Sequence, residues 1–167
     1  MVELLAGLPD AAEARLRAGY EQLTAMGEKA LLADTAGMLA RVLLDGGRLA
    51  EADVVCAVAQ DAAADEDLTA QIVWRGSRAR LLADGGRLEA AEALAREGVR
   101  LAEDTDFLVS RADALTDLGT VLGAAGREDE ADAVLAEASA LYARKGDVVS
   151  AARWRRDHQR KGAVPWR

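Results

Sequence analysis

The sequence predicts an all-α protein made of antiparallel helical hairpins, and three observations support this fold class. The two prolines, Pro9 and Pro165, lie near the ends, so no proline interrupts a helix in the long stretch between them. No segment alternates apolar and polar side chains in the manner of a strand. A short motif that begins with glycine also recurs at a regular interval, which is typical of a repeat protein.

The recurring motif starts with glycine and arginine and carries alanine five residues after the glycine. Its three copies are Gly47–Ala52, Gly86–Ala91 and Gly126–Ala131, at intervals of 39 and 40 residues. Gly7 and Ala12 repeat the glycine and the alanine 40 residues before the first copy. A period of this length accommodates two helices and two turns, so we expect stacked hairpins that form an α-solenoid and bury their core between neighbours.

The first expected elements are a helix over about residues 10–26 and a hairpin over about 28–63. Asp10 and Glu13 have the spacing of a capping box after Pro9, and Gly27 should end the helix. Two glycines then separate the arms of the hairpin, because glycine enters the left-handed backbone region without steric cost. The arms should bury Leu31, Leu32, Met38, Leu39, Val42, Leu43, Ala52, Val55, Cys56 and Ala59.

Two further hairpins are expected over about residues 67–103 and 107–143. The acidic segments 65–67 and 104–106 precede them and should cap their first helices. The second arm of the middle hairpin carries one stripe of small and apolar residues: Leu88, Ala91, Leu94, Ala95, Gly98, Leu101 and Ala102.

The repeat domain is expected to span residues 1–160. We interpret residues 1–6 as the end of a shortened first arm. After Gly146, Asp147 should cap a last helix over residues 147–160, and residues 161–167 should fray.

The charge of the chain is negative and unevenly distributed. The net charge is −8, but residues 144–167 carry +6 and residues 1–143 carry −14. An acidic body opposes general binding to nucleic acid. The sequence has no apolar run near the length of a membrane span and no signal-peptide pattern at its start. We therefore expect neither nucleic-acid binding nor membrane association, and a cytoplasmic location.

The repeated positions resemble those of the tetratricopeptide repeat. Besides the glycine and the alanine, each unit has a small residue seven positions before the glycine and a leucine four positions before it: Ala40, Ala79 and Gly119, and Leu43, Leu82 and Leu122. The resemblance covers nearly the whole chain, in three complete and two partial units. The helix-ending proline of the family is missing, and the period exceeds its usual length of about 34 residues. The resemblance implies a right-handed superhelix whose first arms form a concave, partner-binding face.

The segments Ile72–Arg80, Ala102–Leu115 and Leu141–Arg153 carry a narrower resemblance. They are similar to the C-terminal repeat region of large bacterial signalling ATPases with nucleotide-cyclase or transcription-activator domains upstream. This resemblance implies an excised C-terminal module or a free-standing relative.

No pattern of residues predicts a catalytic, cofactor-binding or metal site. The Gly-Gly-Arg turns lack the strand and the lysine of a phosphate-binding loop. Cys56 is the only cysteine, and His158, the only histidine, has neither a paired nucleophile nor companion ligands at suitable spacing. Helix caps and solvated faces account for the carboxylates. We therefore expect a non-catalytic protein without a cofactor.

Arginines of the middle hairpin are the strongest candidates for binding. Arg75 and Arg78 occupy positions where the other hairpins have packing residues, namely Ala36, Leu39, Leu115 and Leu118. A charge at such a position must be paired or reach water. In a structural interpretation, both arginines pair with acids of neighbouring arms and cover Trp74 with their stems. The acids in reach would be Asp34, Asp113 and Asp117.

In a functional interpretation, the arginines line the concave face and bind carboxylates of an acidic partner. The candidate partner-binding residues are Arg41, Trp74, Arg75, Arg78 and Arg80. The sequence thus predicts a scaffold for a protein or peptide partner. Two alternatives stay open. One is a regulatory or sensor module of a multidomain signalling ATPase or nucleotide cyclase. The other is a homodimerisation module, in which the basic tail with Trp154 and Trp166 docks on the acidic body of a second copy.

Overall fold

The computed structural model describes residues 9–152, and every regular element in this range is a helix. The helices are α2 (Pro9–Met26), α3 (Lys29–Asp45), α4 (Leu49–Ala62), α5 (Leu68–Asp84), α6 (Leu88–Glu103), α7 (Leu108–Ala124) and α8 (Glu128–Lys145). A further helical stretch starts at residue 148 and is described to residue 152. The predicted all-α fold class is confirmed.

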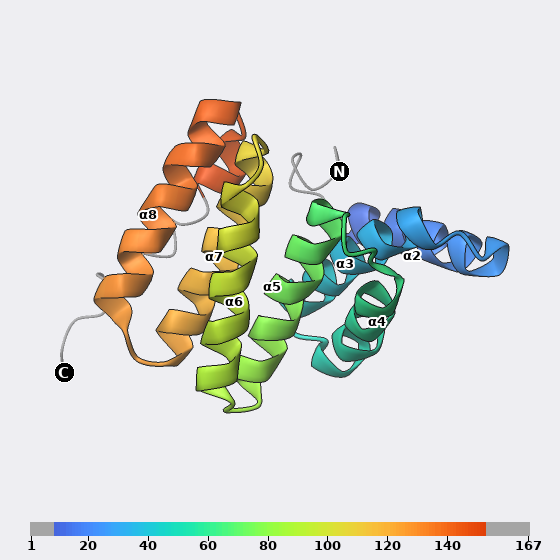
Figure 1. Cartoon of the computed structure of the whole chain (residues 1–167), viewed down its shortest axis with the longest axis horizontal. Coiled ribbons are helices and arrows are strands. Elements are labelled where there is room, and N and C mark those ends of the chain that lie inside the picture. Colours follow the sequence, from blue (N-terminus) through green and yellow to red (C-terminus); the bar gives the residue numbers. More distant parts are fainter. Residues whose placement is uncertain (1–8, 153–167) are drawn as a thin grey trace.

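The helices pack in the order of the chain, and the hairpins lie beside one another (Figure 1). Each helix from α2 to α8 contacts the next. The first arms α3, α5 and α7 also contact one another in turn, so α5 lies between α3 and α7. Short turns join the arms, as expected for antiparallel neighbours.

The hairpin turns share one backbone structure. At the middle turn Gly86 has a φ of 75°, in the left-handed region. The Arg87 N–H donates to the Leu82 carbonyl over 2.8 Å, and the Gly86 N–H donates to the Ala83 carbonyl over 3.0 Å. These two bonds form a Schellman motif, which satisfies the last carbonyls of a helix. Equivalent bonds recur at the turns of residues 46–48 and 125–127, so the repeated glycine marks the end of each first arm.

Small residues allow the two arms of a hairpin to approach closely. The paired alanines Ala40 and Ala52, and Ala79 and Ala91, are all fully buried. In the last hairpin a Cβ atom on Gly119 would lie 2.6 Å from Cγ of Leu135, so no side chain fits there. The core is assembled across hairpins, because Trp74 of α5 packs with residues of α3 and α4, and Ala79 of α5 packs with residues of α7 and α8.

Two of the predicted caps are confirmed. Asp67 precedes α5 and accepts a hydrogen bond from the Ala70 N–H over 3.1 Å. Asp147 accepts one from the Ser150 N–H over 3.0 Å, as expected for the cap of the last helix.

Three other local predictions are wrong. Helix α2 begins at Pro9, so Asp10 lies in its first turn, and Glu13 pairs with Arg17 and Arg48 instead of closing a capping box. The N-cap of α7 is Phe107, which makes no side-chain capping bond, and the side-chain bond from the segment 104–106, at Thr105, is to the N–H of Phe107 and not to an N–H of the first helical turn. Leu31, expected in the core, is 60% exposed; it lies in the first turn of α3, where its backbone N–H donates to the Glu28 side chain.

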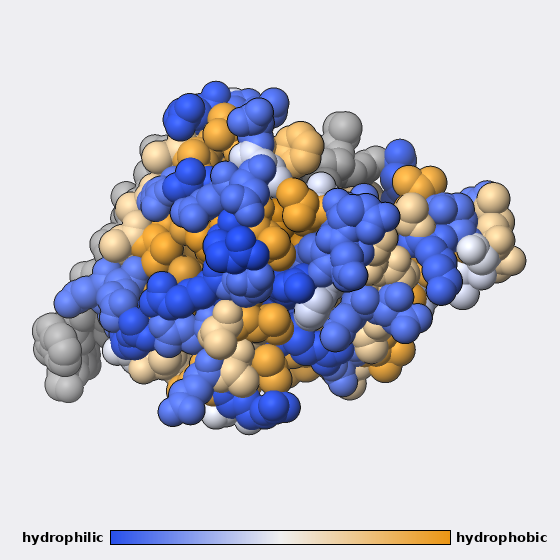
Figure 2. Space-filling model, in the orientation of Figure 1, coloured by the Kyte–Doolittle hydropathy of each residue, from blue (hydrophilic) through white to orange (hydrophobic). Residues whose placement is uncertain are grey.

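Several predictions fall on residues 1–8 and 153–167, which lie outside the described residues. They concern the shortened first arm, His158, the basic tail with Trp154 and Trp166, and most of the last helix. Within residues 9–152, none of the helices combines the length and the apolar character needed to cross a bilayer. On the side shown in Figure 2, hydrophilic residues interrupt the hydrophobic ones across the middle of the molecule.

The left-handed turn predicts opposite effects for two glycine substitutions. Gly86→Ala should lower the free energy of unfolding by about 1–2 kcal/mol, because a Cβ atom disfavours the left-handed region. Gly123→Ala, inside α7, should raise it by up to about 1 kcal/mol, because alanine favours helix and no atom lies within 4 Å of the added Cβ. Urea denaturation of both variants measures these changes, and equal effects of the two would contradict the assignment.

Candidate functional site

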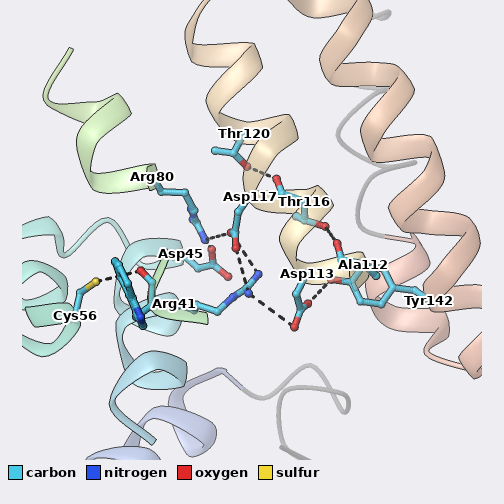
Figure 3. A network of polar contacts seen from close by, with 11 residues as sticks. Arg41, Asp45, Cys56, Arg80, Ala112, Asp113, Thr116, Asp117, Thr120 and Tyr142 are labelled. Atoms are coloured by element: carbon cyan, nitrogen blue, oxygen red, sulfur yellow. Dashed lines mark hydrogen bonds and ion pairs between the residues drawn. The ribbon is translucent and has the colours of Figure 1, made fainter. Parts of the chain in front are cut away.

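The first arms share a buried ionic network (Figure 3). Its central pair joins Arg41 of α3 to Asp117 of α7. The Arg41 Nη1 lies 3.2 Å from the Asp117 Oδ2, and the Arg41 Nη2 donates to the Asp117 Oδ1 over 3.3 Å. Asp117 is only 1% exposed. The pair therefore connects two helices that flank α5 on opposite sides.

Other side chains extend the network to α5 and α8. Arg80 of α5 pairs with Asp45 of α3 over 2.7 Å, and its Nη1 lies 3.8 Å from the Asp117 Oδ1. Arg41 is also 3.8 Å from Asp113, whose carboxylate accepts a hydrogen bond from the Tyr142 hydroxyl on α8. Four helices are thus joined through these polar side chains.

Gly76 makes room for the central pair. A Cβ atom at this position of α5 would lie 2.0 Å from the Asp117 Oδ2. Because glycine has no side chain, the Asp117 carboxylate can lie against the α5 backbone and meet Arg41 beyond it. The network therefore depends on a glycine as much as on its charged residues.

Burial and charge together set the ionisation of the network. Burial raises the pKa of the Asp117 carboxyl, while the guanidinium groups of Arg41 and Arg80 oppose that rise. Burial disfavours the Arg41 cation, but the carboxylates of Asp117 and Asp113 outweigh it and raise the pKa of Arg41. Burial and the Asp113 carboxylate raise the pKa of Tyr142, which stays a neutral hydrogen-bond donor. No nucleophile and base are paired in this arrangement.

The five candidate residues from the sequence do not lie on one surface. Arg41 and Arg80 belong to the ionic network between the first arms. Arg78 pairs instead with Asp53 of α4. Trp74 is buried in the core formed with α3 and α4, which argues against direct contact with a partner.

Gln71 organises Trp74 and Arg75. Its Oε1 accepts hydrogen bonds from the Trp74 indole N–H over 3.1 Å and from Arg75, and its Nε2 donates to the Ala64 carbonyl over 2.9 Å. The Arg75 guanidinium lies 4.3 Å from the centroid of the Trp74 ring, a cation–π contact. Burial lowers the pKa of Arg75.

The structural interpretation therefore accounts for Arg78, which pairs with an acid of the neighbouring arm α4, and for Arg75, which lies over Trp74, although the acids named as partners are wrong. The observed partners are Gln71 for Arg75 and Asp53 for Arg78, whereas Asp113 and Asp117 pair with Arg41. Gly76 and Tyr142, which also contribute to the network, were not among the residues predicted from the sequence. The sequence did contain one signal for this network: Asp117 stands next to the apolar Leu118 on the same predicted helix. A carboxylate in an apolar setting needs a buried partner and room for the pair.

A second set of ion pairs holds neighbouring second arms together at the turns. Arg127 pairs with Glu92 of α6 over 2.6 Å and with Glu130 of α8 over 2.5 Å. The hydrogen bond from Arg127, together with that from Arg96, lowers the pKa of Glu92. Arg48 makes the corresponding pairs with Glu13 of α2 and Glu51 of α4.

A shallow groove of about 300 Å³ lies between α6 and α8, above α7. Its lining includes the apolar Leu118, Leu122 and Val134 and the acidic Glu130 and Glu137. Both glutamates are already paired, with Arg127 and Arg111 respectively. Among residues 9–152, no group of three or more histidine, cysteine, aspartate or glutamate side chains could hold a metal ion.

Comparison with known proteins adds no family to these observations. No protein-family model matches the chain, and no curated protein matches it.

The buried pair predicts a large effect of Asp117→Asn. This change leaves the Arg41 cation without its main counter-charge and should lower the free energy of unfolding by about 3 kcal/mol. Adding Arg41→Met should recover part of the loss, because no unpaired cation then remains. The control is Glu137→Gln at an exposed pair, which should change the free energy by less than about 1 kcal/mol. Urea denaturation measures both changes. If Asp117→Asn lowered the free energy of unfolding as little as Glu137→Gln does, the network would be dispensable for stability.

The lowered pKa of Glu92 predicts a pH-dependent contribution to stability. Because the pKa of Glu92 is lower in the folded chain, the unfolded chain binds more protons between the two pKa values. The ion pair of Glu92 therefore stabilises the fold fully at pH values above the unfolded pKa. It is lost as the pH falls through the folded pKa. Unfolding of the wild type and Glu92→Gln should therefore differ at neutral pH and converge in acid. A difference that is constant over this pH range would exclude the ion pair as its cause.

Proposed function

We propose that this chain is a non-catalytic scaffold that binds a segment of another protein on the face formed by α3, α5 and α7. The observation that carries the proposal is the side-by-side packing of these three first arms, which come from three successive hairpins (Figure 1). Such a row gives one extended face made of rigid elements, and stacked helical repeats use faces of this kind for binding. The resemblance to the tetratricopeptide repeat supports the same proposal.

The ionic network suggests what a partner would meet on this face. The side chains of Arg41 and Arg80 are each 17% exposed and are paired with carboxylates of the chain itself. Asp45 and Asp113 keep about a third of their side-chain surface exposed, at 34% and 32%. A bound segment could therefore donate hydrogen bonds to the partly exposed carboxylates of Asp45 and Asp113. Arg41 and Arg80 would hold these carboxylates in position.

Three more specific expectations from the sequence are part of the same proposal. Membership of the tetratricopeptide-repeat class, a right-handed superhelix and a cytoplasmic location rest on the sequence. The two alternative functions, a regulatory module of a signalling ATPase or cyclase and a homodimerisation module, also stay predictions.

Site-specific photo-cross-linking tests which face binds. A photoreactive amino acid is placed at Thr120, an exposed residue of α7 next to the network, and separately at Ala140, an exposed residue of α8. If the first arms form the binding face, a protein should cross-link in cells to the Thr120 variant and at least several-fold less to the Ala140 variant. Mass spectrometry identifies the protein. Equal cross-linking at both positions, or cross-linking at Ala140 alone, would refute the proposed face.

A further inference from the structure

The turn arginines of the three hairpins form a repeated ion-pair site that one hairpin leaves incomplete. Arg48, Arg87 and Arg127 each follow the repeated glycine directly. Arg48 and Arg127 each bind two carboxylates. One comes from the preceding second arm, Glu13 or Glu92, and the other lies three residues after the arginine, Glu51 or Glu130.

Arg87 lacks both kinds of partner. The residue three positions later is Ala90, which has no carboxylate. The position equivalent to Glu13 and Glu92 is Asp53, six residues after its glycine, and Asp53 pairs with Arg78. Among residues 9–152, the Arg87 side chain makes no ion pair, and the residue is exposed.

Arg78 explains why the middle hairpin differs. It stands where the neighbouring hairpins have Leu39 and Leu118, and it reaches across to α4. The side chain of aspartate is also one methylene shorter than that of glutamate, so Asp53 extends less far toward the turn. Arg78, at a position that is apolar in the other hairpins, thus pairs with Asp53, and Arg87 is left without a counter-charge.

We propose that Arg87 binds a carboxylate side chain from an acidic segment of a partner protein. Arg48 and Arg127 show the arrangement that such a ligand would complete, since each holds carboxylates from two sources. A guanidinium group can bind a carboxylate through two parallel hydrogen bonds, which adds orientation to charge attraction. The site lies at the Gly85–Arg87 turn and not on the face of the first arms. It therefore goes beyond the proposed function and does not depend on it.

The first test titrates the full ¹⁵N-labelled chain with an acetylated and amidated peptide of eight residues that alternates glutamate and serine. The Nε–Hε signals of the arginines report binding. The Arg87 signal should shift most, and the same peptide with glutamine in place of glutamate should leave it unchanged. Shifts spread evenly over the arginines would overturn the proposal.

Matched variants separate the site from general charge effects. Arg87→Ala should weaken peptide binding about threefold, within the range expected for an exposed ion pair. Ala90→Glu should weaken it to a similar extent, because it supplies the carboxylate found at Glu51 and Glu130. Ala90→Gln adds a side chain of similar size without a charge at the same position, and Arg144→Ala removes a charge at a different exposed position; both should bind as the wild type does. Equal binding by Ala90→Glu and the wild type would overturn the proposal.

Arg78→Leu tests the cause of the open site. This variant restores the leucine of the other hairpins and frees Asp53, so Arg87 should pair with Asp53 and the peptide should bind more weakly. Unchanged binding would overturn the role given to Arg78.

A shift of the Arg87 signal with protein concentration alone would assign the carboxylate to a second copy of the chain and would likewise overturn the proposal. None of these results depends on cross-linking at Thr120, so the two proposals can fail separately.

Discussion

The ion pair between Arg41 and Asp117 constrains the relative positions of all three hairpins. In a stacked repeat each unit normally contacts only its neighbours. Here the pair passes the Gly76 position of α5 and joins the first hairpin directly to the third. A buried pair is costly to form, and removing one partner is costlier, because the other charge then stays buried. The pair therefore opposes a change in the relative positions of α3, α5 and α7.

The middle hairpin shows how one departure from a repeat spreads through its surroundings. Trp74, Arg75 and Arg78 occupy or adjoin packing positions, and their polar groups bind two different partners. Trp74 and Arg75 share the side chain of Gln71, which also ties α5 to the end of α4. Arg78 takes Asp53, and the turn arginine loses its expected partner. The same chemical groups that replace apolar packing in this hairpin thus also redistribute charge at the surface of the array.

Much of the fold could be predicted because its signals are local. A glycine that ends a helix in the left-handed region acts through bonds to the preceding turn, as at Gly86, so its position alone locates the end of the first arm. One expected cap failed because its side chain bound other partners. Glu13 was expected to close a capping box, but Arg17 and Arg48 lie close enough to bind it. Such competition depends on which helix packs alongside, and the local sequence does not contain that information.

The sequence by itself determined the all-α class, the order of the hairpins and the positions of their turns, because helix breaks and small-residue crossings repeat at a fixed interval. Only the tertiary structure decided which charges meet. Arg41 and Asp117 are 76 positions apart, and they pair because α3 and α7 flank α5 at a glycine. The same packing places Arg41 and Arg80 between the first arms but directs Arg78 toward α4. Residues that share a repeat can therefore face different helices, and their partners follow from the packing of the helices and not from their spacing in the chain.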